Sequence, residues 1–275
     1  MIHVYTISYP AGLDKEDFTG LFFEVDTEGI EEKEDCIELY LNDAQQKEGE
    51  QFIQELEDIY HLSVQKNVLE NKNWNEQWES SFHPLLIDGF VYVHATFHPP
   101  SKEVPYDIVI EPKMSFGTGH HPTTLQMMRH MRLIDFKHKS VLDCGSGTGI
   151  LAILAEKLGA DSCIALDNDE WCYKNCLENI ELNQSKKITA VIGDLDSLGP
   201  KTYDCILANI HRNFLLENMG KLSSLLVGNG HLFISGFYTQ DSKSLLDKAL
   251  EYNLIANYHS TLENWECLVL QKKVN

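Results

Sequence analysis

The sequence predicts an α/β protein, with a doubly wound, mostly parallel sheet in its C-terminal part and a small α+β unit before it. Three observations support this prediction. Short apolar strands and helical stretches alternate from about Ser140 onward, which is typical of a parallel sheet covered by helices. The first of these strands runs into a glycine-rich turn, "VLDCGSGTG", Val141 to Gly149. Residues 1–70 have strand and helix patterns of their own, so they predict a separate unit.

Length and composition allow this arrangement. The chain has 275 residues, of which 43% are hydrophobic, enough for two domains of unequal size with proper cores. No run of 18 apolar residues exists and the first residues do not resemble a signal peptide, so we expect no membrane association. The seven cysteines form no CxxC pair and several lie in apolar runs, which indicates buried thiols in a reducing, cytoplasmic compartment.

The charge is strongly negative and unevenly distributed. The net charge is −20, and residues 1–80 alone carry 20 Asp and Glu against 5 Lys, a local net charge of −15. Nucleic-acid binding requires clustered cations, so we expect no direct nucleic-acid partner. Two interpretations of the acidic segment stay open: a solvated face, or a surface that attracts a basic protein.

The N-terminal 70 residues predict the order βαββαβ, which is the ferredoxin-like pattern. "MIHVYTISY" and "CIELYL" alternate as strands do, and a helical spacing of apolar residues runs through "DAQQKEGEQFIQELEDIY". The expected elements are a strand at 1–9, a helix at 14–25, a short strand at 29–34, a strand at 36–41, a helix at 43–60 and a strand at 61–69.

Residues 71–110 differ from what precedes and follows them. They begin with a polar stretch, continue as a hairpin around Asp88–Gly89, and end in "HPPSKEVPYD", which contains three prolines. We therefore expect a linker over 71–110 and a second domain over 111–275.

The pattern of the second domain predicts five strands separated by helices, and then a terminal antiparallel hairpin at 255–273. The expected strands lie at 140–145, 162–168, 188–194, 203–210 and 230–237, and the expected helices at 150–160, 171–182, 214–226 and 242–252.

The residues that could bind a ligand lie at the carboxyl ends of these strands. Gly145, Gly147 and Gly149 follow a GxGxG spacing, which differs from the GxGxxG of dinucleotide-binding proteins. Asp167 ends the second strand, where a carboxylate can accept hydrogen bonds from both ribose hydroxyls. Each of these positions could be a simple turn or a helix cap, but together they favour an adenosine-bearing cofactor.

The next two strand ends extend the same polar rim. Asp194 ends the third strand, at a position that suits a contact to an adenine amino group, and Asn209 ends the fourth. Open α/β sheets bind their ligands at this edge.

The stretch "FGTGHHPTT", Phe116 to Thr124, could be a phosphate cradle, half of a metal site, or a loop over another ligand. Adjacent histidines point apart on a regular element, so we expect no metal site at His120 and His121. The stretch predicts a mobile loop that enters a helix, with Pro122 in the first turn and a threonine near the cap.

The motifs described above resemble those of a known family. "VLDCGSGTG", Asp167, Asp194 and "ANI" are similar to the class I, S-adenosylmethionine-dependent methyltransferases, over about 140–275. The order "NWNEQWESSFHP", "IVIEPKMSFGTGHHPTT", "LDCGSGTGILAILAEKLGA", "YDCILANI" more closely resembles the bacterial ribosomal protein L-eleven methyltransferases. The resemblance implies a Rossmann-like seven-stranded methyltransferase sheet behind a ferredoxin-like domain that recruits the substrate.

The resemblance also implies roles for single residues. Thr124, Gly145, Gly147, Asp167 and Asp194 would contact S-adenosylmethionine, and Asn209 would lie beside the transferred methyl group as the catalytic residue. The chain departs from the family at Glu170, where a proline is usual, and at His211 and Arg212, where small or apolar residues are frequent.

The function implied is methylation of amino groups on the eleventh protein of the large ribosomal subunit, free or on the ribosome. Lysine side chains are the expected acceptors, with the N-terminal amine as a further candidate, and we expect a monomer. Three alternatives stay open: a class I methyltransferase acting on another protein or a small molecule, an inactive module that only binds the cofactor, and an NAD-dependent oxidoreductase, which the glycine spacing disfavours. His211 could accept a proton from the amine or be a solvated side chain at the rim.

Overall fold

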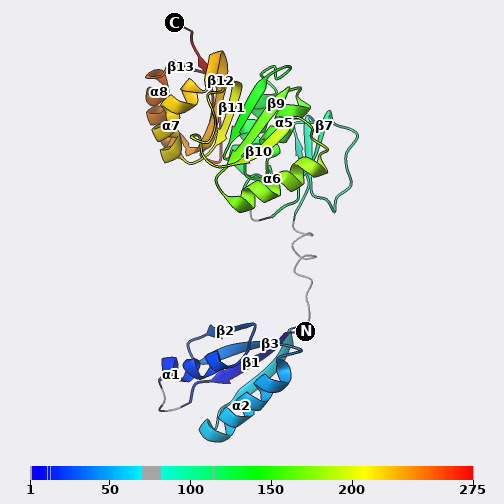
Figure 1. Ribbon diagram of the computed structural model, residues 1–275, viewed down its shortest axis with the longest axis vertical. Coiled ribbons are helices and arrows are strands. Elements are labelled where there is room, and N and C mark those ends of the chain that lie inside the picture. The colour runs from blue at the N-terminus through cyan, green and yellow to red at the C-terminus, as the bar shows by residue number, and fades with distance from the viewer. Residues whose placement is uncertain (1, 11, 13, 70–81, 114, 275) are drawn as a thin grey trace. The chain divides into compact units, whose positions relative to one another are not determined.

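The computed structural model describes residues 2–10, 12, 14–69, 82–113 and 115–274. It divides into two compact units, Met1–Ser81 and Phe82–Asn275, each with its own core (Figure 1).

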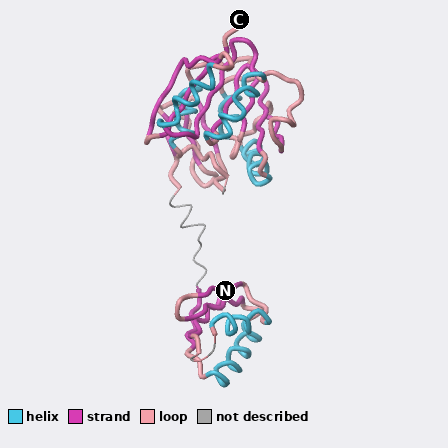
Figure 2. Tube along the Cα trace, turned by 90° about the vertical axis from the view of Figure 1, so that its left-hand side faces the viewer, coloured by secondary structure: helices cyan, strands magenta, loops and turns pink. Residues whose placement is uncertain are grey.

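The first unit has the predicted order βαββαβ. Its sheet has the strand order β2-β3-β1-β4, with antiparallel neighbours throughout, which is the ferredoxin-like arrangement. Figure 2 shows the helices together on one side of this sheet. The elements are β1 (Ile2–Ser8), α1 (Lys15–Gly20), the 3-10 helix η1 (Leu21–Glu24), β2 (Gly29–Glu32), β3 (Cys36–Asn42), α2 (Gln46–Tyr60) and β4 (Val64–Leu69).

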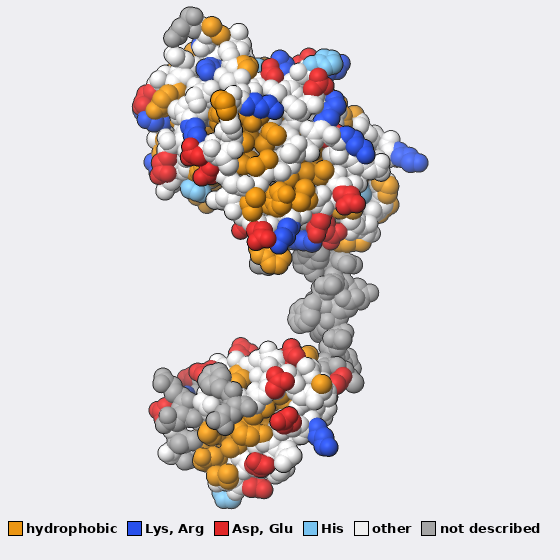
Figure 3. All heavy atoms as spheres, in the orientation of Figure 1, with side chains coloured by type: hydrophobic (Ala, Val, Ile, Leu, Met, Phe, Trp, Pro, Cys, Tyr) orange, Lys and Arg blue, Asp and Glu red, His pale blue; other side chains and the backbone are white. Residues whose placement is uncertain are grey.

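The alternation seen in the sequence produces the core of this unit. Tyr5 and Ile7 of β1 point to the helices, where Phe18 of α1 and Ile53 of α2 pack against them. Acidic residues gather at the surface instead, and Figure 3 shows many Asp and Glu side chains on the visible face of this unit.

The second unit contains the predicted seven-stranded sheet, in the order β10-β9-β8-β11-β12-β14-β13. The first five strands are parallel, and β14 and β13 join as an antiparallel pair. The elements around this sheet are α4 (Pro122–Met131), β8 (Ser140–Cys144), α5 (Ile150–Lys157), β9 (Ser162–Asp167), α6 (Glu170–Leu182), β10 (Ile188–Ile192), β11 (Tyr203–Asn209), α7 (Arg212–Ser224), β12 (Leu226–Tyr238), η2 (Thr239–Asp241), α8 (Ser242–Leu250), β13 (Leu254–Leu262) and β14 (Trp265–Lys272).

Both faces of this sheet are covered by helices. In β8, Val141 belongs to the core under α4 and α5, whereas its neighbour Leu142 belongs to the core under α7 and α8. Figure 2 looks at the unit from the side of α7 and α8, with the strands behind them. The order of strands reverses between β8 and β11, and such a switch point leaves a crevice at the carboxyl ends of the strands.

The predicted linker over 71–110 differs from the structure from residue 82 onward. Residues from 82 belong to the second unit, and β5 (Leu85–Ile87), β6 (Val91–His94) and β7 (Tyr106–Val109) form a three-stranded sheet there. Val93 and Ile108 are fully buried in the core that α4 and α5 share. Apolar side chains therefore attach this three-stranded sheet to the second unit. Residues 70–81 lie outside the described residues.

No helix in the described parts of the chain is long and apolar enough to cross a membrane. All seven cysteines are free thiols, and five of them are buried.

Candidate functional site

A cleft of about 230 Å³ lies at the carboxyl ends of β8, β9 and β10. It is where the reversal of strand order predicts a ligand site. The predicted residues Gly145, Asp167 and Asp194 all line it. The complete lining consists of Cys144, Gly145, Leu166, Asp167, Asn168, Gly193, Asp194, Leu195, Ile210, His211 and Phe214.

The glycine-rich turn forms one wall of the cleft. The backbone N–H groups of Gly145 and Ser146 both donate to the carbonyl of Leu166, at 2.8 and 3.0 Å, which fixes the turn against β9. Gly145 has φ +68°, and a Cβ atom there would lie 2.8 Å from the side chain of Ile210. A glycine is therefore required at this position, and its backbone is open to a ligand.

The carboxylate of Asp167 is oriented by two backbone groups. Its Oδ2 accepts from the N–H of Gly147 at 2.8 Å and its Oδ1 accepts from the N–H of Asp169 at 3.1 Å. Each oxygen keeps a further lone pair, so the carboxylate can accept two more hydrogen bonds in a fixed direction. Gly147 itself does not line the cleft, and it acts on the site through Asp167.

Asp194 also combines a structural role with a place in the cleft. Its Oδ1 accepts from the N–H groups of Asp196 and Ser197, at 2.8 and 3.1 Å. These hydrogen bonds, that of Asp196 first, lower the pKa of Asp194 below its usual range and keep it ionised. Its second oxygen remains for a ligand.

The loop "FGTGHHPTT" crosses the glycine-rich turn. The N–H of Thr148 donates to the carbonyl of Phe116 at 3.0 Å, and the Thr148 hydroxyl donates to the carbonyl of Gly117 at 2.5 Å. The loop then enters α4 with Pro122 in the first turn, as predicted, but the cap is His121, whose Nδ1 accepts from the N–H of Thr123. A threonine was expected near the cap, and Thr123 lies there, with its Oγ1 2.8 Å from Nδ1 of His121.

Thr124 and Asn209 meet at the same edge of the sheet although 85 residues separate them. The Nδ2 of Asn209 donates to Oγ1 of Thr124 at 3.1 Å, which fixes the orientation of the amide. The Oδ1 of Asn209 is buried and has no hydrogen-bond partner among the described residues. A buried acceptor without a partner is costly, so this oxygen indicates a missing donor.

His211 uses Nδ1 to cap a helix, so this nitrogen is not available to take a proton from a substrate. It is the N-cap of α7, where its Nδ1 accepts from the N–H of Phe214 at 3.3 Å. The neutral ring must then carry its proton on Nε2, so the ring offers the cleft a donor and no acceptor.

The charge of the cleft lining is negative. Two carboxylates and no Lys or Arg stand among the lining residues of the cleft. Ribose hydroxyls fit the free lone pairs of Asp167. Within the described residues, no group of three or more His, Cys, Asp or Glu side chains is placed to hold a metal ion.

Several residues at this site were not predicted. Leu195, Ile210 and Phe214 supply the apolar walls of the cleft. Outside the cleft lining, a row of rings runs from Phe116 through His121 and Trp265 to Tyr238, with successive centroids 5.1, 4.9 and 4.2 Å apart. Apolar and aromatic residues carry no sequence signal that distinguishes a site from a core.

Comparison with known proteins adds the family. The family described as Ribosomal protein L11 methyltransferase (PrmA) matches residues 10–273. A ribosomal protein L11 methyltransferase of Bacteroides thetaiotaomicron is 44% identical over 198 residues, 71% of each chain. One of Campylobacter lari is 29% identical over 283 residues, 98% of each chain.

A solved structure shows the same similarity in three dimensions. A ribosomal protein L11 methylase from Lactobacillus delbrueckii subsp. bulgaricus aligns with a TM-score of 0.64 and 26% identity, covering 70% of this chain and 100% of that one. The chain therefore belongs to the ribosomal protein L11 methyltransferase family, and it is a methyltransferase that uses S-adenosylmethionine.

Proposed function

We propose that this protein methylates amino groups of ribosomal protein L11. Lysine side chains are the acceptors, with the N-terminal amine as a further candidate. The observation that carries the proposal is the buried Oδ1 of Asn209, because this acceptor lacks a donor among the described residues and an incoming amine supplies one. The names of the relatives support L11 as the substrate.

We infer the cofactor contacts from the lining of the cleft and from the family. Asp167 would accept from the ribose hydroxyls, Asp194 would face the adenine end, and the backbone of Gly145 would lie against the cofactor. Gly147 holds Asp167 in place. Thr124 and Asn209, which are hydrogen-bonded to each other, would lie beside the transferred methyl group.

S-adenosylmethionine supplies an activated methyl group whose leaving group is a neutral thioether, so no acid is needed at the leaving atom. The amine, in contrast, must be neutral to attack, and a lysine with a pKa of about 10.4 is mostly protonated at pH 7. Asn209 accepts one N–H of the amine and so directs its lone pair toward the methyl group. Because Thr124 fixes the amide, this orientation is set before the substrate arrives, and orientation can contribute several kcal/mol.

The site favours the neutral amine by removing water from it. Ile210 follows Asn209 in the chain and lines the cleft, and burial among apolar side chains lowers the pKa of an amine. His211 does not take the proton, since its Nδ1 is used by the cap. The proton leaves to solvent before the amine is enclosed.

The first unit is proposed to recruit the substrate. Its net charge of −15 complements a basic ribosomal protein, free or on the ribosome, and disfavours a direct contact with RNA. The free thiols of the chain fit a reducing, cytoplasmic compartment, and we propose that the protein acts there as a monomer.

Incubation with tritiated S-adenosylmethionine and ribosomes that lack the modification tests this proposal. Label is expected in L11, and Asn209→Ala should slow its incorporation about a hundredfold with little effect on cofactor affinity. Asn213→Ala is the matched control, because Asn213 is an exposed asparagine on α7 whose Oδ1 accepts from the neighbouring Arg212. Label in another protein would refute the substrate, and cofactor binding without any label would favour an inactive module.

A further inference from the structure

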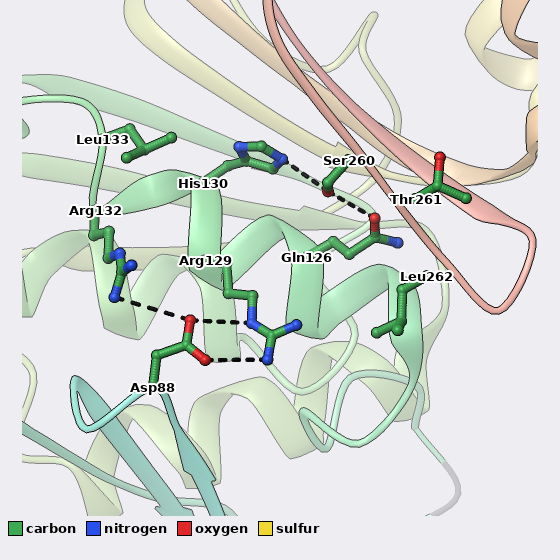
Figure 4. A pocket seen from close by; sticks show the side chains of 9 residues that line it. All are labelled: Asp88, Gln126, Arg129, His130, Arg132, Leu133, Ser260, Thr261 and Leu262. Carbon is green, nitrogen blue, oxygen red and sulfur yellow. Dashed lines mark hydrogen bonds and ion pairs between the residues drawn. The ribbon is translucent and has the colours of Figure 1, made fainter.

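A buried polar network joins α4 to β13 and β14 and takes no part in the mechanism above. Figure 4 shows its members: Gln126 and His130, one helical turn apart on α4, and Ser260 of β13 between them. Gln126 is 1% exposed and His130 is 7% exposed. Polar side chains buried this deeply require satisfied hydrogen bonds, so their partners define what the network holds.

The direction of each hydrogen bond in the network is determined. Gln126 donates from Nε2 to the backbone carbonyl of Trp265 at 3.2 Å, so its Oε1 must be the acceptor on the other side. Ser260 donates its single hydroxyl proton to that Oε1 at 2.7 Å. The Ser260 oxygen can then only accept, and it accepts from Nε2–H of His130 at 2.8 Å.

This assignment leaves His130 as the neutral tautomer with its proton on Nε2. Its Nδ1 is buried without a partner among the described residues. Burial, and then the nearby His259, lower the pKa of His130, which agrees with a neutral ring. A pocket of about 250 Å³ lies beside the network, and its lining includes Asp88, which pairs with Arg129 and Arg132 (Figure 4).

The other end of the network reaches the edge of the functional site. The ring of Trp265 lies between His121, 4.9 Å away, and Tyr238, 4.2 Å away. His121 caps the helix that carries Thr124. Tyr238 ends β12 three residues after Ser235, which pairs with Asn209 in the sheet. Trp265 therefore stands at the same edge of the sheet as Asn209.

Trp265 begins β14 directly after a tight turn, where it pairs with Tyr238 of β12 and with Leu262 of β13. Glu263 and Asn264 form the turn between β13 and β14, and both have positive φ. The turn fixes the register of the hairpin and the pairing with β12 holds β14 in the sheet, but neither fixes the hairpin tip against α4. The hydrogen bond from Gln126 to the Trp265 carbonyl and the bond from His130 to Ser260 attach both strands of the hairpin to α4.

We propose that Gln126, Ser260 and His130 are positioning residues, which hold Trp265 at the edge where the amine substrate enters and so control methyl transfer without touching the cofactor. The inference rests on the proposed function in one respect, namely that the amine enters beside Asn209. Loss of any member would leave a buried group unpaired, so the hairpin tip would move to find other partners.

The experiment uses the full chain labelled with 5-fluorotryptophan, in which Trp265→Phe identifies the fluorine resonance of Trp265. Gln126→Met and His130→Leu remove donors of the network while preserving volume. His130→Gln places an amide N–H where Nε2–H stood, and an amide, unlike an imidazole, does not become charged. Ser223→Ala is the matched control, because Ser223 is 5% exposed and its hydroxyl donates to the Tyr252 carbonyl at 3.0 Å, outside the network.

We expect Gln126→Met and His130→Leu to shift or broaden the Trp265 resonance and to lower kcat for methylation of L11 about tenfold at saturating cofactor. Affinity for S-adenosylmethionine should stay within about twofold, since no member of the network lines the cleft. His130→Gln should restore the resonance and most of kcat, and Ser223→Ala should change neither.

Three results would overturn the inference: an unmoved Trp265 resonance in Gln126→Met, a loss of cofactor affinity that parallels the loss of kcat, or a His130→Gln protein no better than His130→Leu. Failure of the proposed function is distinguishable from these, because the wild-type protein would then not methylate L11. The resonance of Trp265 would still report whether the network positions it.

Discussion

Asp143 and Asp167 belong to neighbouring strands, yet Asp143 is buried in the core whereas Asp167 lines the cleft. Asp143 is 1% exposed, accepts one hydrogen bond from the N–H of Ala152, and has an Oδ1 without a partner among the described residues. Burial raises its pKa to about 8, and the nearby Asp167 adds to this. Asp143 is therefore mostly protonated at neutral pH, and Asp167 is the carboxylate that faces the cleft.

The buried carboxyl group predicts a pH dependence of stability. Because the folded pKa of Asp143 is raised, the folded state binds its proton more tightly than the unfolded chain, and stability falls as pH rises from about 4 to about 8. An asparagine side chain cannot ionise, so Asp143→Asn should gain stability relative to wild type between pH 5 and pH 8, by up to about 4 kcal/mol. Denaturant unfolding without cofactor at both pH values measures this difference.

Asp204→Asn provides the control for this prediction. Burial acts to raise the pKa of Asp204, but hydrogen bonds from Ser140 and the nearby Lys139 lower it overall, and neither partner changes charge between pH 5 and pH 8. Its difference from wild type should be nearly flat between pH 5 and pH 8. An equally flat difference for Asp143→Asn would show that the group is ionised when folded.

The ribose assignment of Asp167 predicts a binding defect. Asp167→Ala removes both the proposed ribose contacts and the acceptor for Gly147, so affinity for S-adenosylmethionine should fall by at least about tenfold in calorimetry. Asp169→Ala is a useful comparison, because Asp169 caps α6 and lies outside the lining of the cleft. Equal affinities for the wild-type and Asp167→Ala proteins would show that the ribose lies elsewhere.

At the scale of elements, the site is made by two loops that fit against each other. Gly147 has φ +54°, and a Cβ atom at this position would lie 2.2 Å from the carbonyl oxygen of Phe116. The same carbonyl accepts from Thr148, so the loop before α4 and the turn before α5 cannot separate without losing hydrogen bonds. This attachment uses backbone atoms, which leave no pattern in the sequence, and the mobility expected for the loop stays a prediction.

Gly147→Ala should therefore act on both loops. The substitution combines a left-handed backbone, which costs about 1–2 kcal/mol for a residue with a side chain, with a clash against backbone that cannot rotate away. We expect a lower melting temperature and weaker cofactor binding, since Asp167 would lose the N–H that orients it.

Gly199→Ala is the matched change, because a Cβ atom there would meet nothing within 4 Å. It should behave as wild type in both the melting and the binding measurements. If Gly147→Ala did the same, the two loops could not be in contact as described.

Element types were predictable where periodicity and turn chemistry agree. The strands from β8 to β12 could be located because each is apolar and most run into a glycine, an acid or an asparagine. β7 was missed since Pro105 directly precedes it and the region is rich in prolines. The helix cap at His121 was missed because histidine is not among the usual capping residues.

At the scale of the whole molecule, the polar residues of the site were predictable and their surroundings were not. Asp167, Asp194 and Asn209 stand at strand ends, and parallel strands bring their ends to one edge. The position of Trp265 depends on the hairpin register and on a contact with Gln126, 139 residues away in the chain. No local pattern encodes such a contact.

The distribution of charge predicts that the first unit attracts the substrate and that the second unit binds the cofactor. Of the net charge of −20, the first unit carries −15, because residue 81 adds none, and the second unit carries −5. Attraction between separated charges weakens as salt shortens the Debye length, from about 10 Å at 0.1 M to about 3 Å at 1 M. If the first unit recruits a basic substrate, KM for intact L11 should rise with salt while affinity for the cofactor changes little.

Removing residues 1–81 tests the same division directly. The remaining unit keeps both of its cores and every residue of the cleft, so it should bind S-adenosylmethionine within about twofold of the full chain. Methylation of intact L11 should be lost, together with its salt dependence. In the full chain, Glu32→Gln with Glu34→Gln should weaken the salt dependence, whereas Glu178→Gln with Glu181→Gln, the same charge change at exposed positions of α6, should not. Normal turnover of L11 by the truncated protein would mean that the second unit recognises its substrate alone.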